Sequence, residues 1–331
     1  MSDYPYASFV SRTPLPISTG EVLEKLWRTL RGSWKLYLGL GAPLAVVGTA
    51  WMVLTFAALF AAGALPPRPG VQPDLMRVIP LLFGASLIGM IPNLVIYALY
   101  QAATAFTALK EASGQKTTVR EAYAVAWGRA GHYCWLIFLH YLCVALPALL
   151  CGGIFAGVML ALQAAHQSDS PVMLLAIPLF FLAYLGAMVY AIWMMLRLGM
   201  AFPASVAESL TAVEALKRSA KLSCKVKGKL FLVLLVVYAI SYAAIFVLEI
   251  GGGLVFAVGA LLFAALHLSE TAGIAAGVVA GLAFVVLIFA YTALIWAAYT
   301  ISFTIVYCDQ RLRLDGSASE PGPAAGGSVP A

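Results

Sequence analysis

The chain has 331 residues, of which 63% are hydrophobic and only 10% are charged. A soluble chain of this length would form about two domains, but this composition excludes the soluble class and favours a membrane protein. There are 20 lysine and arginine residues against 14 aspartate and glutamate residues, which gives a formal net charge of +6. Such an excess suits a surface that meets anionic lipid headgroups.

Six apolar stretches exceed the roughly 20 residues that a helix needs to cross a bilayer core of about 30 Å. Charge, proline or a polar run separates each stretch from the next. We therefore expect an all-α fold, a polytopic membrane bundle of six transmembrane helices. The stretches are Leu36–Leu65, Val78–Leu109, Tyr133–Leu162, Val172–Ala201, Leu230–Leu266 and Thr271–Tyr307.

Residues 1–17 are predicted to be a flexible leader, and the membrane domain is expected over 18–316. An amphipathic surface helix opens this domain at Ser18, which forms a capping box with Glu21: each side chain bonds the backbone N–H of the other residue. Two further boxes of the same kind occur, and each of the three comes just before a pair of spans. The unit of one surface helix and two spans thus occurs three times, which predicts three pseudo-repeats over about 18–110, 117–204 and 211–308. The second and third boxes are Thr118 with Glu121 and Thr211 with Glu214.

The third surface helix is the most basic of the three. On a helical wheel its cations gather on one side, and small or apolar residues gather on the other. Each cation near an anionic membrane surface contributes about 1 kcal/mol. The candidate headgroup contacts are Lys217, Arg218, Lys221 and Lys225.

The distribution of positive charge predicts the orientation. If the six spans alternate in direction, eighteen of the 20 lysine and arginine residues fall on one side of the membrane, and only Arg68 and Arg77 fall on the other. The positive-inside rule places the rich side in the cytoplasm. Both termini and all three surface helices are therefore expected to be cytoplasmic.

The fifth span is longer than a bilayer requires. A helix from Leu230 to Glu249 already rises about 30 Å, which places Glu249 near the outer boundary. A break or kink is expected at Gly251–Gly253, directly after it. The run Leu254–Leu266 would then be either a strongly tilted continuation of the span or a half-inserted segment. The final residues, 317–331, are rich in Gly, Pro, Ser and Ala and are predicted to be disordered.

Charged and imidazole side chains inside spans are functional candidates by default. Glu249 is interfacial by the length argument, and Glu208 is expected to pair with a nearby or terminal cation. His132 and His140 are interpreted as core or interfacial histidines, since neither has a carboxylate near it in sequence. The last span closes with a polar cluster that would anchor it at the surface, formed by Asp309, Arg311 and Arg313.

The sequence contains no nucleophile elbow, Walker loop, HExxH motif or metal-binding cysteine spacing. We therefore expect no enzymatic activity, no catalytic residue, no cofactor and no metal. The basic helices are expected to face lipid, which excludes a nucleic-acid partner.

Two stretches carry a family resemblance. The run Phe202–Glu208 followed by Glu214–Ser219, and the closing pattern Tyr307-x-Asp309-x-Arg311-x-Arg313-x-Asp315-Gly316, resemble the six-span membrane domain found at the N-terminus of some bacterial glycerophosphoryl diester phosphodiesterases. Gly20–Leu23 is similar to the opening of that domain. The resemblance implies a bacterial inner-membrane protein. No soluble barrel follows the last span and the metal-binding motifs of the enzyme are absent, so the resemblance does not imply phosphodiesterase activity.

Two functions remain open from the sequence. The first is a non-enzymatic membrane module that contacts the bilayer's anionic headgroups, or a membrane protein partner, through its basic cytoplasmic helices. The second is a small transporter or permease with a pathway between the helix pairs, which the prolines in the spans and the expected break after Glu249 favour. A polar cavity crossing the bundle would support transport, whereas outward-facing lysines over a packed interior would support the module.

Overall fold

A computed structural model describes residues 17–61, 75–164, 171–265 and 270–317, and all regular secondary structure in these ranges is helical. Six of the helices are long and apolar enough to cross a bilayer, which confirms the all-α class and a multi-pass membrane protein. The long helices are α1 (Thr19–Ala61), α2 (Leu75–Ala112), α4 (Ala130–Ala164), α5 (Pro171–Leu198), α8 (Lys227–Ala265) and α9 (Glu270–Ser317). The short ones are α3 (Val119–Gly128), α6 (Ala201–Glu208) and α7 (Ala212–Ser223).

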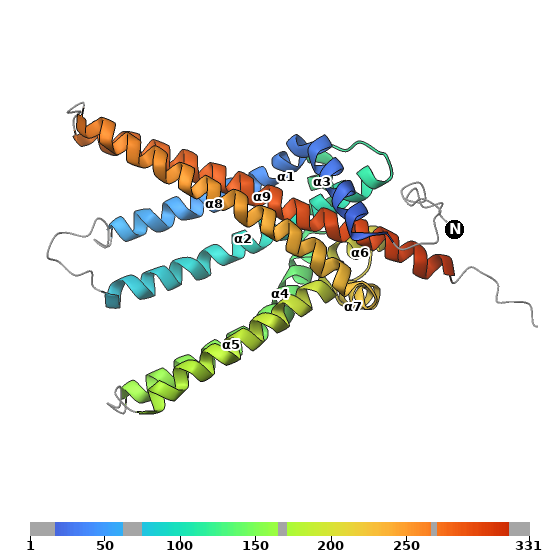
Figure 1. Cartoon of the computed structure of the whole chain (residues 1–331), viewed down its shortest axis with the longest axis horizontal. Helices are drawn as coiled ribbons and strands as arrows, with labels where there is room; N and C mark the ends of the chain where they lie inside the picture. Colours follow the sequence, from blue (N-terminus) through green and yellow to red (C-terminus); the bar gives the residue numbers. More distant parts are fainter. Residues whose placement is uncertain (1–16, 62–74, 165–170, 266–269, 318–331) are drawn as a thin grey trace, which may run out of the picture.

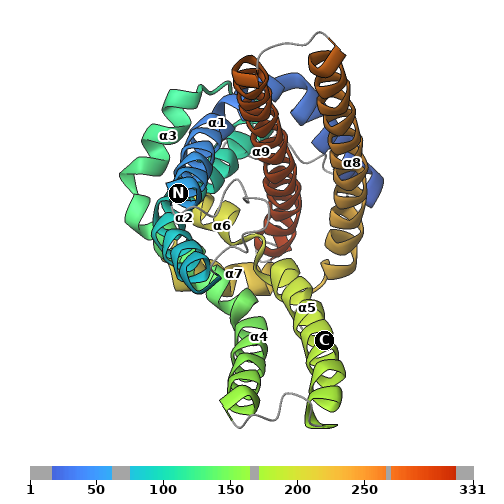
Figure 2. The ribbon, with the colours of Figure 1, turned by 90° about the vertical axis from the view of Figure 1, so that its left-hand side faces the viewer.

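The long helices form three hairpins, α1–α2, α4–α5 and α8–α9, which converge at one end and diverge toward the other (Figure 1). The short helices α3, α6 and α7 lie at the convergent end, which we call the charged end because most of the described lysines and arginines are there. Helix α1 packs along α9, so the first and third hairpins share a long contact. The α4–α5 hairpin stands apart from the others over its outer half (Figure 2).

All three expected boxes lie at helix starts, those at Ser18 and Thr211 as full capping boxes and that at Thr118 as a hydroxyl cap on α3. The N–H of Ser18 donates to Glu21 (2.7 Å), and the N–H of Thr211 donates to Glu214 (3.0 Å). The N–H of Glu121 donates to the Thr118 hydroxyl (3.2 Å). The first surface helix and the first span are two helices that meet at a kink within α1, where Ser33 is non-helical (φ −126°, ψ 25°). This local bend turns the surface part of α1 into its membrane-spanning part.

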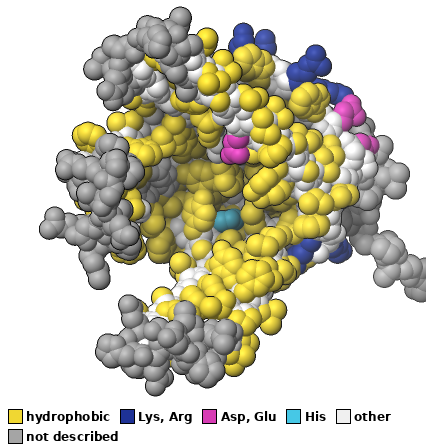
Figure 3. Space-filling model, turned by 60° about the vertical axis from the view of Figure 1, so that its left-hand side comes forward, with side chains coloured by type: hydrophobic (Ala, Val, Ile, Leu, Met, Phe, Trp, Pro, Cys, Tyr) yellow, Lys and Arg dark blue, Asp and Glu magenta, His cyan; other side chains and the backbone are white. Residues whose placement is uncertain are grey.

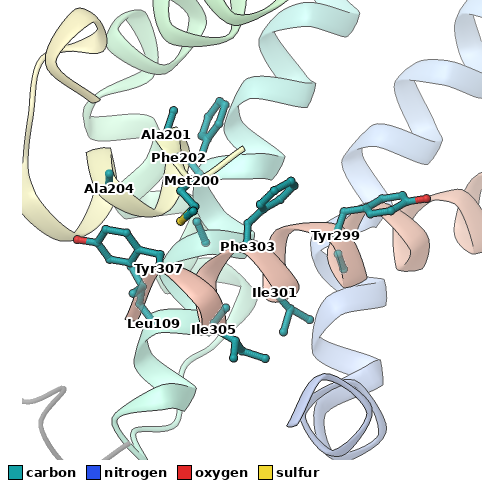
Figure 4. Close-up of a cluster of buried hydrophobic side chains, with 14 of the residues drawn as sticks. Leu109, Met200, Ala201, Phe202, Ala204, Tyr299, Ile301, Phe303, Ile305 and Tyr307 are labelled. Atoms are coloured by element: carbon teal, nitrogen blue, oxygen red, sulfur yellow. The ribbon is translucent and has the colours of Figure 1, made fainter. Parts of the chain in front are cut away.

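The hydrophobic core lies at the charged end. Buried side chains come from the ends of the long helices that meet there and from the short helices between them. Figure 4 shows α6 placed against α9, with Phe202 near Phe303 and Ala204 near Tyr307. One stretch of α9, from Ala297 to Gln310, is completely buried. Burial of this apolar surface, at about 25 cal/mol per Å², holds the three hairpins together.

The outer halves of the hairpins form no core of their own. In α4 no described residue beyond Ile137 is buried, and in α8 none is buried beyond Val237. The exposed side chains there are large and apolar, as expected of surfaces in contact with acyl chains. The bundle is therefore tight at one end and open to lipid at the other.

One expectation about the spans needs correction. The predicted break at Gly251–Gly253 does not occur, because α8 continues as one helix to Ala265 and thus includes most of Leu254–Leu266. Inside a helix in lipid the intrahelical hydrogen bonds outweigh the weak helix propensity of three glycines. Fully helical, α8 is about 58 Å long, so it tilts or extends beyond a core of about 30 Å. The predicted leader and tail lie almost entirely outside the described residues, although α9 reaches Ser317.

Candidate functional site

Helix α7 is fixed to the charged end by its serines. The hydroxyls of Ser219 and Ser223 donate to the carbonyl of Arg197 at the end of α5 (3.0 and 3.2 Å). The N–H of Met200, just before α6, donates to Ser219 (3.1 Å). Helix termini leave backbone groups without intrahelical partners, and these serines satisfy groups at the junction of α5 and α6. Together with Ala215 they are fully buried, which fixes the face of α7 that points inward.

The opposite face of α7 presents lysines to the outside. Lys217, Lys221 and Lys225 are all exposed and recur every four residues, with Lys225 in the turn that leads to α8. Arg218 differs from these lysines. Its side chain is 20% exposed and its Nε donates to the carboxylate of Glu208 (3.2 Å). Arg218 therefore braces α7 against α6.

Glu208 is the centre of a polar cluster where α6, α7 and α9 meet. It ends α6 and accepts a hydrogen bond from the Tyr307 hydroxyl of α9 (2.7 Å) as well as from Arg218. The Nε of Arg311 lies 3.7 Å from the same carboxylate. The side chains of Glu208 and Arg311 are each 16% exposed. Two cations and one phenol thus converge on a single carboxylate that joins three helices.

The other two residues of the closing cluster pair with each other. Arg313 donates to Asp309 one turn earlier on α9 (3.2 Å), and Asp309 is buried. The amide of Gln310 also donates to Asp309 (3.0 Å). These contacts lie within α9, and they neutralise the charge of its last turns.

Carboxylates at two other helix starts have local electrostatic roles. Glu121 accepts from Lys110 Nζ (2.6 Å) at the end of α2 and from the Thr117 hydroxyl (2.9 Å). These bonds, that with Lys110 first, hold the pKa of Glu121 below its usual value of 4.5. In the third repeat, hydrogen bonds from Thr211 lower the pKa of Glu214 in the same way. Both carboxylates are therefore ionised near neutral pH.

The remaining polar candidates lie apart from the Glu208 cluster. Glu249 is exposed on the outer half of α8, about 33 Å along the helix from Lys227. His132 Nε2 is 2.7 Å from the Ser205 hydroxyl, so this imidazole ties α4 to α6. The residues singled out from the sequence therefore do not form one site.

A cavity of about 110 Å³ lies between α2, α4, α9 and the turn from α5 to α6. Sequence reasoning missed it, because its walls come from four distant parts of the chain. Most of the lining is aromatic or aliphatic, and none of the lining residues is Lys, Arg, Asp or Glu. Its polar lining residues are Tyr97, Gln101, His140, Tyr141, Tyr299 and Thr300.

The polar residues of the cavity are connected in a chain. Thr300 on α9 donates to the Oε1 of Gln101 on α2, and Gln101 Nε2 donates to the Tyr97 hydroxyl (2.7 Å). The ring of Tyr141 on α4 lies beside that of Tyr97, with centroids 6.1 Å apart. His140 Nδ1 is buried and has no hydrogen-bond partner among the described residues. The only sequence signal for this site was the presence of Gln101 and His140 within apolar spans.

Within the described ranges no group of three or more His, Cys, Asp and Glu side chains could hold a metal ion. The five cysteines are free, and Cys224 at the end of α7 is the exposed one among them. No family model, curated protein or solved structure matches the chain. The basis for a functional proposal is therefore the geometry of the chain itself.

Proposed function

We propose that the chain is a non-enzymatic module of a bacterial inner membrane that binds anionic lipid headgroups through Lys217, Lys221 and Lys225. The charged end faces the cytoplasm in this proposal. The observation that carries it is the exposed row of three lysines on α7 and the turn that follows it, with the opposite face of α7 fixed to the core. A rigid support keeps the cations at one level, so they can engage a headgroup layer together.

The aromatic residues of the other surface helices support this placement. Trp27 and Trp127 are 64% and 66% exposed, at corresponding positions of the first two repeats. Tryptophan is most stable at the depth of the headgroups, where its ring is in apolar surroundings and its N–H can reach water. Helices α1 and α3 would thus rest on the membrane surface beside α7.

The charge balance supports binding of anions rather than cations. Glu208 is occupied by Arg218, Arg311 and Tyr307, and Glu214 is occupied by the capping box of α7. Glu214 still attracts Lys217 electrostatically, but neither carboxylate forms an ion pair with any of the three lysines among the described contacts. At about 1 kcal/mol for each cation, three lysines would strengthen binding of an anionic lipid roughly hundredfold.

A transport pathway has weaker support. The polar lining residues of the cavity occupy about 6 Å along α2, from Tyr97 to Gln101, which is a small part of a bilayer core of about 30 Å. A group of polar residues confined to one depth favours a binding site over a route across the membrane.

The test measures lipid-dependent stability of the purified chain in a neutral detergent. Dioctanoylphosphatidylglycerol should raise the unfolding temperature more than dioctanoylphosphatidylcholine does. Replacing Lys217, Lys221 and Lys225 with glutamine should remove this difference, whereas replacing them with arginine should keep it. Equal stabilisation of the wild type and the glutamine variant by the anionic lipid would refute the proposal.

Orientation can be tested with the native cysteine of α7. A membrane-impermeant maleimide should label Cys224 in inside-out vesicles and leave it unlabelled in intact spheroplasts, with Cys224→Ser as the control. Labelling from the outside would place the charged end opposite to the proposed side.

A further inference from the structure

The cavity between α2, α4, α6 and α9 is lined by residues of the helices that are long and apolar enough to cross a membrane. Gln101 is about 14 Å along α2 from Lys110, and Thr300 is about 17 Å along α9 from Arg311. A site this far from the charged end is reached from within the bilayer. Figure 3 shows a hollow in this part of the molecule whose walls are mostly hydrophobic, with a histidine side chain visible in it.

The lining excludes a charged ligand. Lys, Arg, Asp and Glu are absent from the residues that form the cavity. A phosphate or carboxylate at this depth would lack a counterion, and an unpaired ion in a medium of low dielectric constant is very unstable. The ligand head must therefore be uncharged.

The polar groups favour a head with acceptor oxygens. Tyr97 accepts a hydrogen bond from Gln101 and its own hydroxyl is hydrogen-bonded to Tyr141, so the O–H proton of Tyr141 is the one that can be donated onward. The imidazole of His140 has one buried nitrogen without a partner among the described residues, which is rare in folded proteins. A carbonyl or hydroxyl oxygen in the cavity would give these side chains a partner.

The shape and the remaining lining favour a flat ring. Trp296 meets Tyr97 edge to face, with ring centroids 5.4 Å apart, and Phe202 and Phe303 complete the aromatic wall. An apolar cavity of about 150 Å³ accommodates benzene, so about 110 Å³ leaves room for at most one six-membered ring. An apolar tail would leave through the open side into the lipid.

We propose that this cavity binds the uncharged, carbonyl-bearing six-membered ring of a lipid-soluble amphiphile, of which a tailed benzoquinone is the simplest example. The ring lies among Tyr141, His140 and Trp296, and its oxygens accept hydrogen bonds from Tyr141 and His140. This site is separate from the lysines of α7 and does not depend on the headgroup proposal.

The test uses quenching of tryptophan fluorescence by a benzoquinone with a decyl tail, added to the full chain in nanodiscs. We expect saturable quenching that is largely lost in Trp296→Phe. His140→Phe should weaken binding about three- to tenfold, because the net contribution of one hydrogen bond is lost. His140→Gln, which keeps a donor, should bind within about threefold of the wild type.

A cavity-filling pair separates binding in the cavity from partition into lipid. Val144→Phe narrows the cavity and should abolish saturable quenching, whereas Leu149→Phe, on the exposed side of the same helix, should leave it unchanged. Quenching that rises linearly without saturation, or equal binding by Val144→Phe and the wild type, would overturn the proposal. Displacement of the quinone by dioctanoylglycerol at equal concentration would also overturn it, because that lipid has a neutral head but no ring.

Discussion

Replacing Glu208 with alanine tests whether the polar cluster holds the charged end together. The change removes a carboxylate that accepts from Tyr307 (2.7 Å) and Arg218 (3.2 Å) and leaves Arg311 without this partner. Breaking a buried ion pair costs about 3–5 kcal/mol. The side chains here are 16–20% exposed, so water can partly hydrate the charges that lose their partner. We therefore expect a loss of about 2–3 kcal/mol in the free energy of unfolding.

The assay is reversible unfolding in mixed micelles with increasing SDS, followed by helical circular dichroism. Glu24→Ala is the matched control, because Glu24 and Arg28 form a one-turn pair at 2.5 Å with side chains 67% and 76% exposed. Such a pair is worth about 0.5 kcal/mol or less. If Glu208→Ala lowers the free energy of unfolding no more than Glu24→Ala does, the contacts of Glu208 do not stabilise the packing of the three helices.

Three further predictions concern other contacts at the charged end. Gly41→Ala would place its Cβ 2.3 Å from a side-chain carbon of α9 and should lower the free energy of unfolding by about 1–3 kcal/mol in the same assay. Gly84→Ala is the control, because a Cβ there meets nothing within 4 Å and should not destabilise the chain. The pKa of Glu121 is lowered in the fold, so Glu121 stabilises the folded state above pH 4.5, and this stabilisation is lost as the pH falls through the lower pKa of the folded state. Amide exchange in α3, corrected for intrinsic rates, should therefore accelerate in that pH range. A corrected exchange rate that does not change with pH would contradict this. Thr211→Val removes the cap of α7 and should cost about 1 kcal/mol, seen as faster exchange in α7 but not in α3.

Local sequence patterns predicted the elements well. Continuous apolar runs are long enough to specify six spans, and the boxes at Ser18, Thr118 and Thr211 mark helix starts that the structure confirms. These signals depend on residues three or four apart, which a sequence displays directly. The prediction of a break at Gly251–Gly253 was wrong, because in lipid the need to satisfy backbone hydrogen bonds outweighs the low helix propensity of glycine.

Contacts between distant segments were predicted only in part. The pairing of Glu208 with a cation follows from its position at a helix end, but the choice of Arg218 and Arg311 depends on how α6, α7 and α9 meet. The cavity could not be predicted, since Gln101 and Thr300 are separated by most of the chain. No local pattern indicates that they share one hydrogen-bond chain.

The confinement of the core to the charged end makes the bilayer part of the architecture. Each hairpin is a lever, about 42 Å long in the case of α5, whose outer part buries few side chains among the described residues. A thicker or thinner membrane would tilt these levers to match its hydrophobic width. The inner ends of the hairpins lie at the level of α6 and α7. A change in membrane thickness would therefore shift the lysine row and the Glu208 cluster.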